Sequence, residues 1–437
     1  MSPLYSWGRV PDAPQCGHGC NWRSELPGHV ARLVADHTST LPYGNGRSYG
    51  DSCLASSDQV VQMRGLDRLI EADWANGVVR VEAGMTLAEL LALAIPRGWF
   101  LPVTPGTQFA TVGGAIGNDV HGKNHHRRGT FGNHLLGLGL LRHGEEVLEC
   151  SPDENAEMFA ATIGGLGLTG LVCWAQIRLI AIRASQIDTR TVRFNGLADF
   201  FALSDELDSQ HEYAVAWVDC MATGAQRGRG VYIVGDHARY GALRVDGRRK
   251  LRVPFAPPVS LVNRFSLKPF NSLYWHAHPK VITDGRSEYE PFFYPLDRIL
   301  HWNRIYGRPG FQQYQCVLPE RTARQALDEV LTQVSAAGQG SFLAVLKRCG
   351  HLRSPGLLSF PMPGTSLALD FPQTSALVTR LFPRLDAIVR EAGGRLYPAK
   401  DAHMNGADFR LAYPAWERLE ALRDPTLMSR FWKRVIV

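Results

Sequence analysis

The sequence contains no long apolar segment. The leucine-rich stretch at 135–141 is interrupted by glycines and ends at Arg142, so it falls short of the roughly 18 residues that a membrane-spanning helix needs. The first nine residues show neither the basic start nor the apolar core of a secretory signal. We therefore expect a cytoplasmic protein that crosses no membrane.

Cysteine is scarce, with eight residues among 437, which is too few for a disulfide framework. Only Cys16 and Cys20 lie close together, with His18 between them, and no second Cys/His pair follows at zinc-ligand spacing. The histidines at 121, 125 and 126 also lack a helical His-x-x-x-His pair with a carboxylate. We expect no metal site.

Charge of one sign is only mildly in excess, with 47 Lys and Arg against 41 Asp and Glu, a net charge of +6. This charge could attract phosphates, anionic lipid or nucleic acid. No zinc finger, helix-turn-helix or RNA-binding aromatic motif accompanies it, so we expect no nucleic-acid partner. Eight basic residues lie at 227–252, among glycines. We interpret this stretch as an exposed loop, either simply solvated or in contact with a membrane surface.

The period of the apolar pattern changes between residues 72 and 98. Val79, Val81 and Ala83 alternate with polar residues, as in a half-buried strand. Thr86 can then cap a helix over 87–95, which Pro96 ends. A helix at 156–163, a sharp turn at 164–170 and a strand at 171–179 follow. These elements predict an α+β domain in the first 180 residues.

A second α+β domain is predicted from residue 183 to about residue 394. The apolar patterns favour strands at 213–219, 311–317, 341–347 and 366–371, and helices near 323–336 and 375–392.

The densest glycine motif is PYGNGRSYGD at 42–51. Three glycines within seven residues let successive main-chain N–H groups point into one concavity, which can hold a pyrophosphate. A loop that is merely rich in turns is the alternative. The motif is not the Rossmann fingerprint, because Tyr49 and Gly50 displace its third glycine and no helix follows.

A second glycine cluster at 105–116 leads into NDVHGKNHH at 118–126. Gly113 and Gly114, at a predicted helix start, offer bare amides to an anion. His121, Lys123, His125 and His126 concentrate donors just beyond, which fits anionic or redox chemistry.

Together with the turn at 162–170, these loops resemble the FAD domain of vanillyl-alcohol-oxidase (PCMH) type flavoenzymes. Over nearly its whole length the chain is similar to the decaprenylphosphoryl-ribose oxidase family, the flavin subunits of a sugar epimerase. The matching stretches are Gly46–Asp51, Val120–His126, Ser359–Pro361 and Ala399–Asp401. The resemblance implies a two-domain α+β fold. Residues 1–182 and 395–437 form the FAD-binding domain, and 183–394 form an inserted substrate-binding domain with an antiparallel sheet.

The resemblance also assigns FAD contacts. They fall on Tyr43, Gly44, Asn45, Gly46, Arg47, Ser48, Tyr49, Gly50, Asp51, Gly106, Thr111, Val112, Gly113, Gly114, Asn118, Asp119, Val120, His121, Val172 and Tyr397. Many relatives in the wider superfamily attach the flavin to a histidine of the first glycine loop. This loop has no histidine, so we expect noncovalent FAD.

The resemblance further implies that the sugar lies against the flavin. The substrate contacts are His121, Lys347, Gln313, Gln315, Asp370 and Trp217, and the catalytic candidates are Lys400, Tyr49 and Lys123. Alcohol oxidation requires a base within reach of the hydroxyl proton. Lys400 can act as that base or as a proton relay if burial or a neighbouring cation such as Lys347 lowers its pKa.

Several of these positions also have simpler interpretations. Lys400 could form a surface ion pair with Asp401, and Lys123 could be a solvated loop residue. Gln313 and Gln315 share one face of a strand and could merely bond its neighbours. Trp217 could be a core residue.

The chain departs from the family at Tyr43 and Asn45 in the FAD loop, and at Ser366 and Ala368, where an asparagine and, in mycobacterial members, a cysteine are expected. The sugar is therefore left open.

We predict oxidation of a secondary sugar hydroxyl, at C2 of a polyprenyl-phosphate-linked ribose, to a keto sugar. An NAD(P)H-dependent reductase partner would complete the epimerisation. Peripheral contact with the inner membrane face would bring the enzyme to its lipid-linked substrate. The alternative is an oxygen-using alditol or sugar-lactone oxidase of the same superfamily that acts on soluble substrates.

Overall fold

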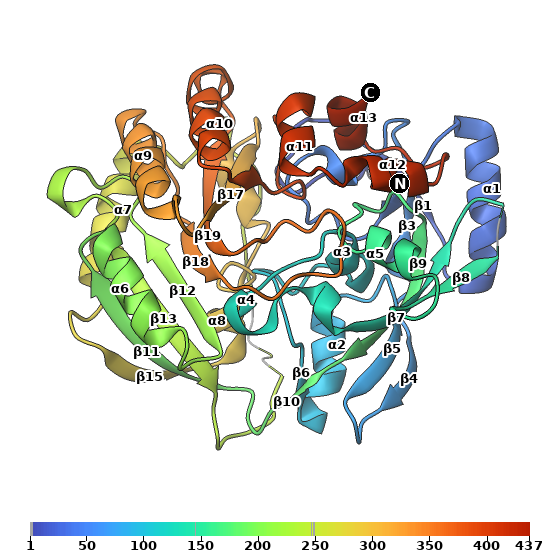
Figure 1. Cartoon of the computed structure of the whole chain (residues 1–437), viewed down its shortest axis with the longest axis horizontal. Coiled ribbons are helices and arrows are strands. Elements are labelled where there is room, and N and C mark those ends of the chain that lie inside the picture. The colour runs from blue at the N-terminus through green and yellow to red at the C-terminus, as the bar shows by residue number, and fades with distance from the viewer. Residues whose placement is uncertain (1–2, 145, 246, 248–249) are drawn as a thin grey trace.

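The computed structural model describes residues 3–144, 146–245, 247 and 250–437. A five-stranded and an eight-stranded sheet occupy opposite halves of the molecule, and both chain ends lie in the half with the five-stranded sheet (Figure 1). Helices accompany both sheets, so the predicted α+β class is confirmed. In the described part of the chain, no helix is both long and apolar enough to cross a bilayer.

The five-stranded sheet is antiparallel throughout. Its strand order is β4 (Leu69–Asp73), β5 (Val78–Glu82), β9 (Leu171–Arg178), β7 (Leu135–Leu141) and β8 (Val147–Cys150). Its half also contains α2 (Leu87–Ala94), α3 (Val112–Gly117) and α5 (Ala156–Thr162), whereas α4 (His125–Arg128) contacts the eight-stranded sheet. A small parallel sheet joins β1 (Cys16–Gly19), β3 (Gln59–Gln62) and β2 (Pro42–Tyr43) beside α1 (Leu26–His37). The predicted elements at 79–83, 87–95, 156–163 and 171–179 are confirmed within one or two residues.

Thr86 caps helix α2, as the sequence predicted, and together with Glu89 it forms a capping box. Thr86 Oγ1 accepts a hydrogen bond from Glu89 N at 3.2 Å, and Glu89 Oε2 accepts one from Thr86 N at 2.7 Å. The apolar face of α2 is fully buried through Leu87, Leu90 and Leu91. The cap therefore fixes the start of a helix that belongs to the core.

We expect Thr86→Ala to lower the free energy of unfolding by about 1 kcal/mol, because it leaves first-turn amides of α2 without an acceptor. Urea denaturation followed by circular dichroism measures this loss. Thr379→Ala is the control, since Thr379 is exposed and its hydroxyl only donates to Ser375 O. Equal losses in the two variants would contradict the capping role.

The eight-stranded sheet is also antiparallel. Its order is β15 (Thr283–Ser287), β11 (Ile187–Phe194), β13 (Gly230–His237), β12 (Tyr213–Val218), β18 (Ala344–Cys349), β19 (Gly364–Pro372), β17 (Phe311–Pro319) and β20 (Arg395–Leu396). Helices α6 (Leu197–Leu207), α9 (Ala323–Ala336) and α10 (Phe382–Glu391) pack along it (Figure 1). The predicted strand at 341–347 begins three residues later, at Ala344. The predicted helix at 375–392 is confirmed: the chain is helical from residue 375, and a π-helical turn (Leu377–Leu381) leads into α10.

Several smaller elements lie outside the two main sheets. They are β6 (Trp99–Phe100) with β10 (Ile180–Ala181), β14 (Leu251–Arg252) with β16 (Ile299–Leu300), α7 (Arg264–His276) and α8 (Tyr289–Phe293).

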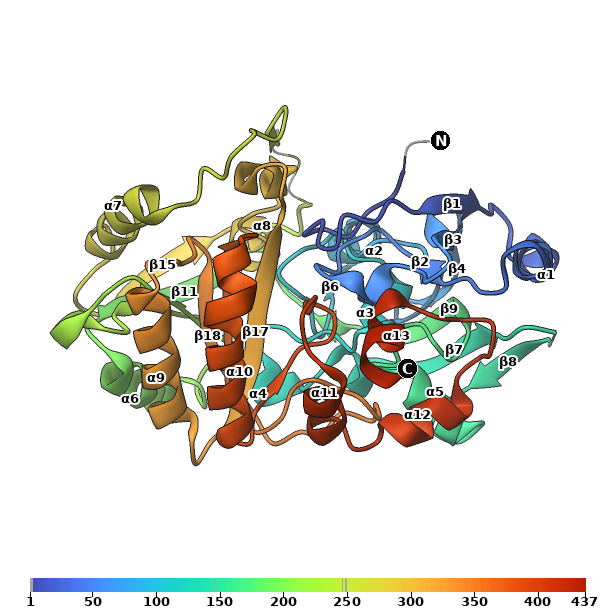
Figure 2. The ribbon, with the colours of Figure 1, turned by 90° about the horizontal axis from the view of Figure 1, so that it is seen from above.

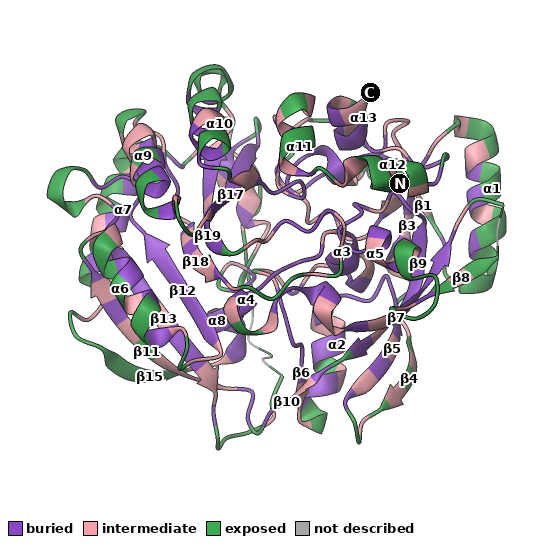
Figure 3. Cartoon of the chain, in the orientation of Figure 1, coloured by how far each residue is buried: buried purple, intermediate pink, exposed green. Residues whose placement is uncertain are grey.

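The prediction of an exposed loop at 227–252 is wrong for its first half. Gly230–His237 forms β13 inside the eight-stranded sheet, and Val231 and Val234 are fully buried (Figure 3). The glycines that suggested a loop instead allow close packing. A Cβ on Gly230 would lie 2.1 Å from the carbonyl oxygen of Trp217.

The first two arginines of that stretch are ion-paired. Arg227 contacts Asp328 at 2.9 Å, and the buried Arg229 contacts the buried Asp219 at 2.9 Å. These side chains serve packing within the protein. Three further charged residues of the stretch, Asp246, Arg248 and Arg249, lie outside the described residues.

The C-terminal segment returns to the half that holds the N-terminus (Figure 2). It carries α11 (Gly406–Ala412), α12 (Trp416–Leu422) and α13 (Arg430–Ile436). Arg434 of α13 bonds two buried carboxylates, Asp51 at 2.8 Å and Asp401 at 2.9 Å. The first glycine loop and the segment around Lys400 are thereby held together. The domain bounds 1–182, 183–394 and 395–437 stay a prediction.

Candidate active site

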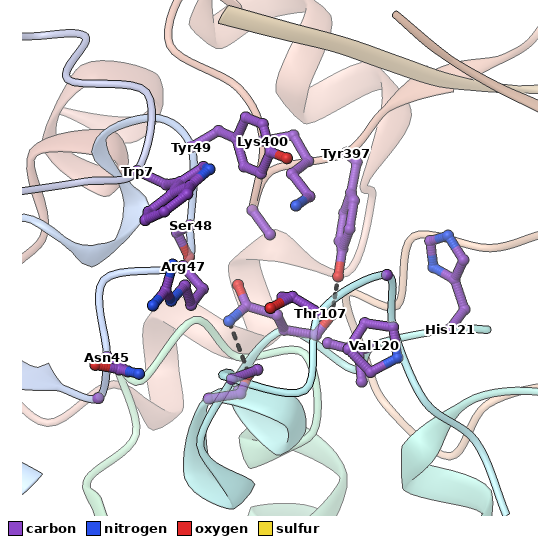
Figure 4. A pocket seen from close by; sticks show the side chains of 18 of the residues that line it. Trp7, Asn45, Arg47, Ser48, Tyr49, Thr107, Val120, His121, Tyr397 and Lys400 are labelled. Atoms are coloured by element: carbon purple, nitrogen blue, oxygen red, sulfur yellow. Dashed lines mark hydrogen bonds between the residues drawn. The ribbon is translucent and has the colours of Figure 1, made fainter. Parts of the chain in front are cut away.

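A cavity of about 310 Å³ is lined by residues from both halves of the molecule. The first glycine loop, the segment 104–123 and β9 contribute one side, and strands β12, β17, β18 and β19 contribute the other. Lys400 and Tyr49 lie at one part of the wall, whereas His121 lies at another, beyond Tyr397 (Figure 4). The two segments with glycine motifs and the later candidate residues therefore meet in one place.

The first glycine loop presents main-chain donors to the cavity. Gly46, Arg47 and Ser48 line it, and their N–H groups have no hydrogen-bond partner within the described residues. Gly46 has a φ of +59°, a conformation that glycine adopts without strain. The expected concavity of bare amides is present in this loop.

The second glycine cluster does not offer its amides in the same way. Gly113 N donates to Ala83 O at 2.8 Å, and Gly114 N donates to the capping hydroxyl of Thr111 at 3.1 Å. The expectation of bare amides at this helix start is wrong, because the protein itself supplies the acceptors. Gly113 and Gly114 still line the cavity, so their contribution is a close-fitting wall.

Three observations show that the cavity fits a flavin dinucleotide. The first glycine loop presents its unbonded N–H groups. A Cβ built on Gly106, which lines the cavity, meets no atom within 4 Å, so a side chain there would enter open space. Two buried polar atoms, Nε of Arg47 and Nδ1 of His121, have no partner in the described part of the chain. Buried polar atoms normally have a hydrogen-bond partner, and a bound dinucleotide can supply it for these two.

The opposite wall is one face of the eight-stranded sheet. Residues directly opposite in antiparallel strands share a face. Gln315 pairs with Ala368, and Ala368 in turn pairs with Val345. Gln313 pairs with Asp370 in the same way. The intervening Tyr314 points to the other side and contacts Asp386 of α10 at 3.0 Å.

Lys400 lies in a connected polar group. Its Nζ is 3.8 Å from the ring centroid of Tyr49. Gln313 Nε2 donates to Asp370 Oδ1 at 2.6 Å, and the second oxygen of this fully buried carboxylate has no partner among the residues described. Gln313 thus bonds the neighbouring strand β19, as its simpler interpretation predicts. Gln315 does not, because its amide N donates to His121 Nε2, outside the sheet, at 3.1 Å.

Three cavity lysines have lowered pKa values. Burial lowers the pKa of Lys400 to about 8, against an opposing effect of Asp370 and with a further lowering by Lys347. Burial lowers the pKa of Lys347 to about 8, and burial together with Lys347 lowers the pKa of Lys123 to about 8. Burial raises the pKa of Asp370 to about 7, while Gln313 and Lys400 lower it. Groups that change protonation near neutral pH therefore gather here, as in many active sites.

His121 is held neutral. Burial lowers its pKa well below 6.5, and Lys347, His125 and Lys400 lower it further. Because Gln315 donates to Nε2, the ring proton of His121 is on Nδ1. That N–H is a donor available to a ligand.

Seven predicted site residues do not line the cavity. Tyr43, Gly50, Asp51, Val112 and Asp119 lie behind the loops that form its wall, Asp370 lies behind Gln313, and Trp217 packs elsewhere. Asp119 accepts from Ser354 and Ser359, both at 2.5 Å, and so anchors the segment at 354–359. Trp217 donates to Phe342 O at 2.9 Å and packs on Tyr274. The structure thus gives Trp217 the core role that was the alternative.

The sequence motifs missed two lining residues of chemical interest. Trp7 stacks on the Arg47 guanidinium at 4.2 Å. Burial raises the pKa of Asp297 to about 6, while Gln108 N and Thr107 Oγ1 donate to its carboxylate. Both residues come from segments without any glycine motif, so only the folded chain identifies them.

Among the residues that the structure describes, no group of three or more His, Cys, Asp and Glu side chains could hold a metal ion.

The chain was compared with known proteins. A family described as FAD binding domain matches residues 25–151, which include both glycine loops. The chain is 35% identical over 396 residues to the decaprenylphosphoryl-β-D-ribose oxidase of Mycolicibacterium smegmatis, covering 87% of this chain and 85% of the relative. The chain belongs to the decaprenylphosphoryl-β-D-ribose oxidase family.

Membership of this oxidase family makes the chain an FAD-dependent oxidoreductase, which confirms the sequence prediction of family and cofactor. An uncharacterised protein of Streptomyces coelicolor is 34% identical over 365 residues, covering 78% of this chain and 96% of that relative. The human Delta(24)-sterol reductase is 32% identical over 112 residues, covering 26% of this chain and 22% of that enzyme. FAD is the cofactor for which the cavity is built.

Proposed function

We propose that this oxidase oxidises the C2 hydroxyl of a polyprenyl-phosphate-linked ribose to a keto sugar. The observation that carries the proposal is the cluster of Lys400, Tyr49 and Gln313 in the FAD cavity, with the buried Asp370 bonded behind Gln313. The name of the mycolicibacterial relative supports this substrate class. An NAD(P)H-dependent reductase would act on the keto sugar to complete an epimerisation.

Each group in the cavity has a proposed role in this oxidation. When bound, FAD supplies the acceptor for the hydride that leaves the sugar carbon. The first glycine loop and Gly106 would hold the dinucleotide. Lys400 Nζ takes the hydroxyl proton, and the Tyr49 ring fixes the position of that nitrogen. Neutral His121 donates from Nδ1 to a sugar oxygen.

The other two lysines are proposed to bind the anionic part of the substrate. Lys347 Nζ donates to Gly122 O at 3.1 Å and keeps two further protons for a phosphate. Lys123 lies on the same wall of the cavity. Two ammonium groups suit the negative charge that the two free oxygens of a lipid–sugar phosphodiester share.

We expect the rate of flavin reduction at saturating substrate to rise about tenfold between pH 7 and pH 9, with an inflection near 8. Lys400 accepts a proton only when neutral, and its pKa is about 8, so its reactive form increases as the pH rises. Stopped-flow absorbance at the flavin band measures the rate. An inflection near pH 7 that disappears in Asp370→Asn would instead identify Asp370 as the group that accepts the hydroxyl proton.

Anaerobic bleaching of the bound flavin tests the function itself. Polyprenylphosphoryl ribose is expected to bleach it, whereas soluble alditols and sugar lactones leave it yellow. Rapid bleaching by a soluble polyol, with hydrogen peroxide formed in air, would instead establish the alternative of an oxygen-using oxidase.

The flavin is proposed to be held without a covalent bond. The loop at 43–51 contains no histidine, and burial raises the pKa of the nearby cavity cysteine, Cys53, to about 12, so its thiol is unreactive. Acid precipitation should therefore leave the yellow colour in the supernatant. A yellow pellet would contradict this.

Peripheral contact with a membrane completes the proposal, because the substrate carries a lipid chain. Arg227 and Arg229 of the stretch originally assigned to this contact are ion-paired within the protein. The contact therefore has to lie elsewhere, or on the later part of that stretch.

A further inference from the structure

Exposed apolar side chains concentrate in one part of the chain. Of 19 large hydrophobic residues exposed among those described, 12 lie between residues 240 and 299. Scattered exposed hydrophobic residues need no explanation, but a concentration of this kind marks an interaction surface. Six of them define what we name the α7 face: Phe255, Val259, Leu261, Phe265, Leu273 and Val281.

Helix α7 packs one side against the protein and exposes apolar side chains on another side. Leu267, Asn271 and Trp275 form its buried side, whereas Phe265 and Leu273 are 75% and 72% exposed. Figure 2 shows α7 at the edge of the molecule, apart from the strands of the eight-stranded sheet. Two large apolar side chains thus point to solvent from a helix that is already anchored.

The charge of this region identifies the chemistry of its partner. Residues 247–283 contain seven Lys and Arg and neither Asp nor Glu. Lys268 and Lys280 are exposed, and no described carboxylate lies within ion-pair distance of either. A surface that combines free cations with exposed Phe, Leu and Val matches an anionic lipid bilayer, which offers phosphates and an apolar interior together.

Other residues of helix α7 pack against segments next to the active site. Tyr274 of α7 packs on Trp217 with ring centroids 4.7 Å apart, and Phe270 packs on Phe342 at 4.7 Å. Phe342 precedes Leu343, which lines the FAD cavity. A helix that touches the wall of the cavity is well placed to bring a lipid-linked substrate to it.

A second cavity shares one lining residue with the α7 face and one with the FAD cavity. It has a volume of about 440 Å³ and is lined by Phe255 and by Trp7, which also lines the FAD cavity. Phe311 of the second cavity packs against Trp302 of the FAD cavity, with ring centroids 5.5 Å apart, so side chains of the two cavities are in contact.

We propose that the α7 face docks on the surface of an anionic membrane, with Phe265 and Leu273 inserted between lipids and Lys268 and Lys280 on their phosphates. The docking needs no sugar and no reaction. Only its purpose, delivery of a lipid-linked substrate through the second cavity, rests on the proposed function.

Co-sedimentation of the FAD-loaded protein with vesicles tests the proposal. The protein is expected to bind phosphatidylcholine vesicles that contain phosphatidylglycerol, and to bind them more weakly at high salt. The double variant Phe265→Ser/Leu273→Ser should weaken binding at least about tenfold. The variant Lys268→Gln/Lys280→Gln should weaken it about fivefold per lysine, and only on vesicles with phosphatidylglycerol.

The matched controls are Leu411→Ser and Lys433→Gln, which change exposed side chains of α11 and α13, away from the α7 face. Both should bind vesicles like the unchanged protein. All variants should keep their flavin and their thermal midpoint, because the replaced side chains are exposed.

Undiminished vesicle binding by Phe265→Ser/Leu273→Ser would overturn the proposal. So would sedimentation equilibrium, without lipid, that shows a dimer dissociated by the same variant, since the α7 face would then be a contact between two copies. Either result leaves the bleaching of flavin by a sugar unaffected, so the two proposals fail separately.

Discussion

Replacing Lys400 by methionine should slow substrate-dependent flavin reduction by roughly 100- to 10,000-fold, the usual contribution of a general base. Methionine retains most of the length of the side chain and its contact with the Tyr49 ring. It removes the Lys400 amine, whose nitrogen lies 3.8 Å from the centroid of that ring and interacts electrostatically with the buried Asp370. Anaerobic stopped-flow with a polyprenylphosphoryl ribose measures the rate.

Lys433→Met is the control, because Lys433 is exposed on the last helix. Both variants should bind FAD with equal stoichiometry. In Lys400→Met the residual rate should no longer increase between pH 7 and pH 9. An unchanged reduction rate, with the pH dependence intact, would remove Lys400 from the mechanism.

Replacing Gly106 by leucine should produce a folded but colourless protein. A Cβ at this position meets no atom within 4 Å, so the new side chain fits the protein and projects into the cavity. Because one leucine side chain would occupy space that the dinucleotide needs, we expect the affinity for FAD to fall about 100-fold. Reconstitution with FAD, followed by quenching of flavin fluorescence, measures the affinity.

Gly19→Leu provides a matched control. Gly19 also has no atom within 4 Å of a built Cβ, but it is exposed on β1 and does not line the cavity. This variant should retain FAD at the unchanged affinity. If Gly106→Leu also stayed yellow, the dinucleotide would not contact Gly106, and the proposal that Gly106 helps to hold FAD would be wrong.

Local patterns predicted much of this molecule. The cap at Thr86 directly precedes the helix that it starts, and the alternation at 311–317 placed Gln313 and Gln315 on one face. The spacing of Gly44, Gly46 and Gly50 likewise indicated a loop with free amides. Each of these features is decided by neighbours in the sequence, which a single chain displays.

Features that depend on distant residues were missed. Whether Gly113 and Gly114 keep their amides free depends on the acceptors Ala83 O and Thr111 Oγ1. Arg229 suggested a loop because its buried partner, Asp219, lies ten residues earlier across a turn. The lowered pKa of Lys400 results from burial among residues of both sheets.

The segment that carries Lys400 is bonded to both halves of the protein. Tyr397 N donates to Gln315 O at 3.0 Å, while Tyr49 N donates to Ala399 O at 3.1 Å. Anyone who recombines this enzyme with a relative to alter its sugar preference therefore faces a constraint. A chimera that exchanges only residues 187–394 would receive the sheet residues of the relative but keep its own Lys400, whose position is set by bonds to the original sheet. The exchanged segment therefore has to extend through Asp401.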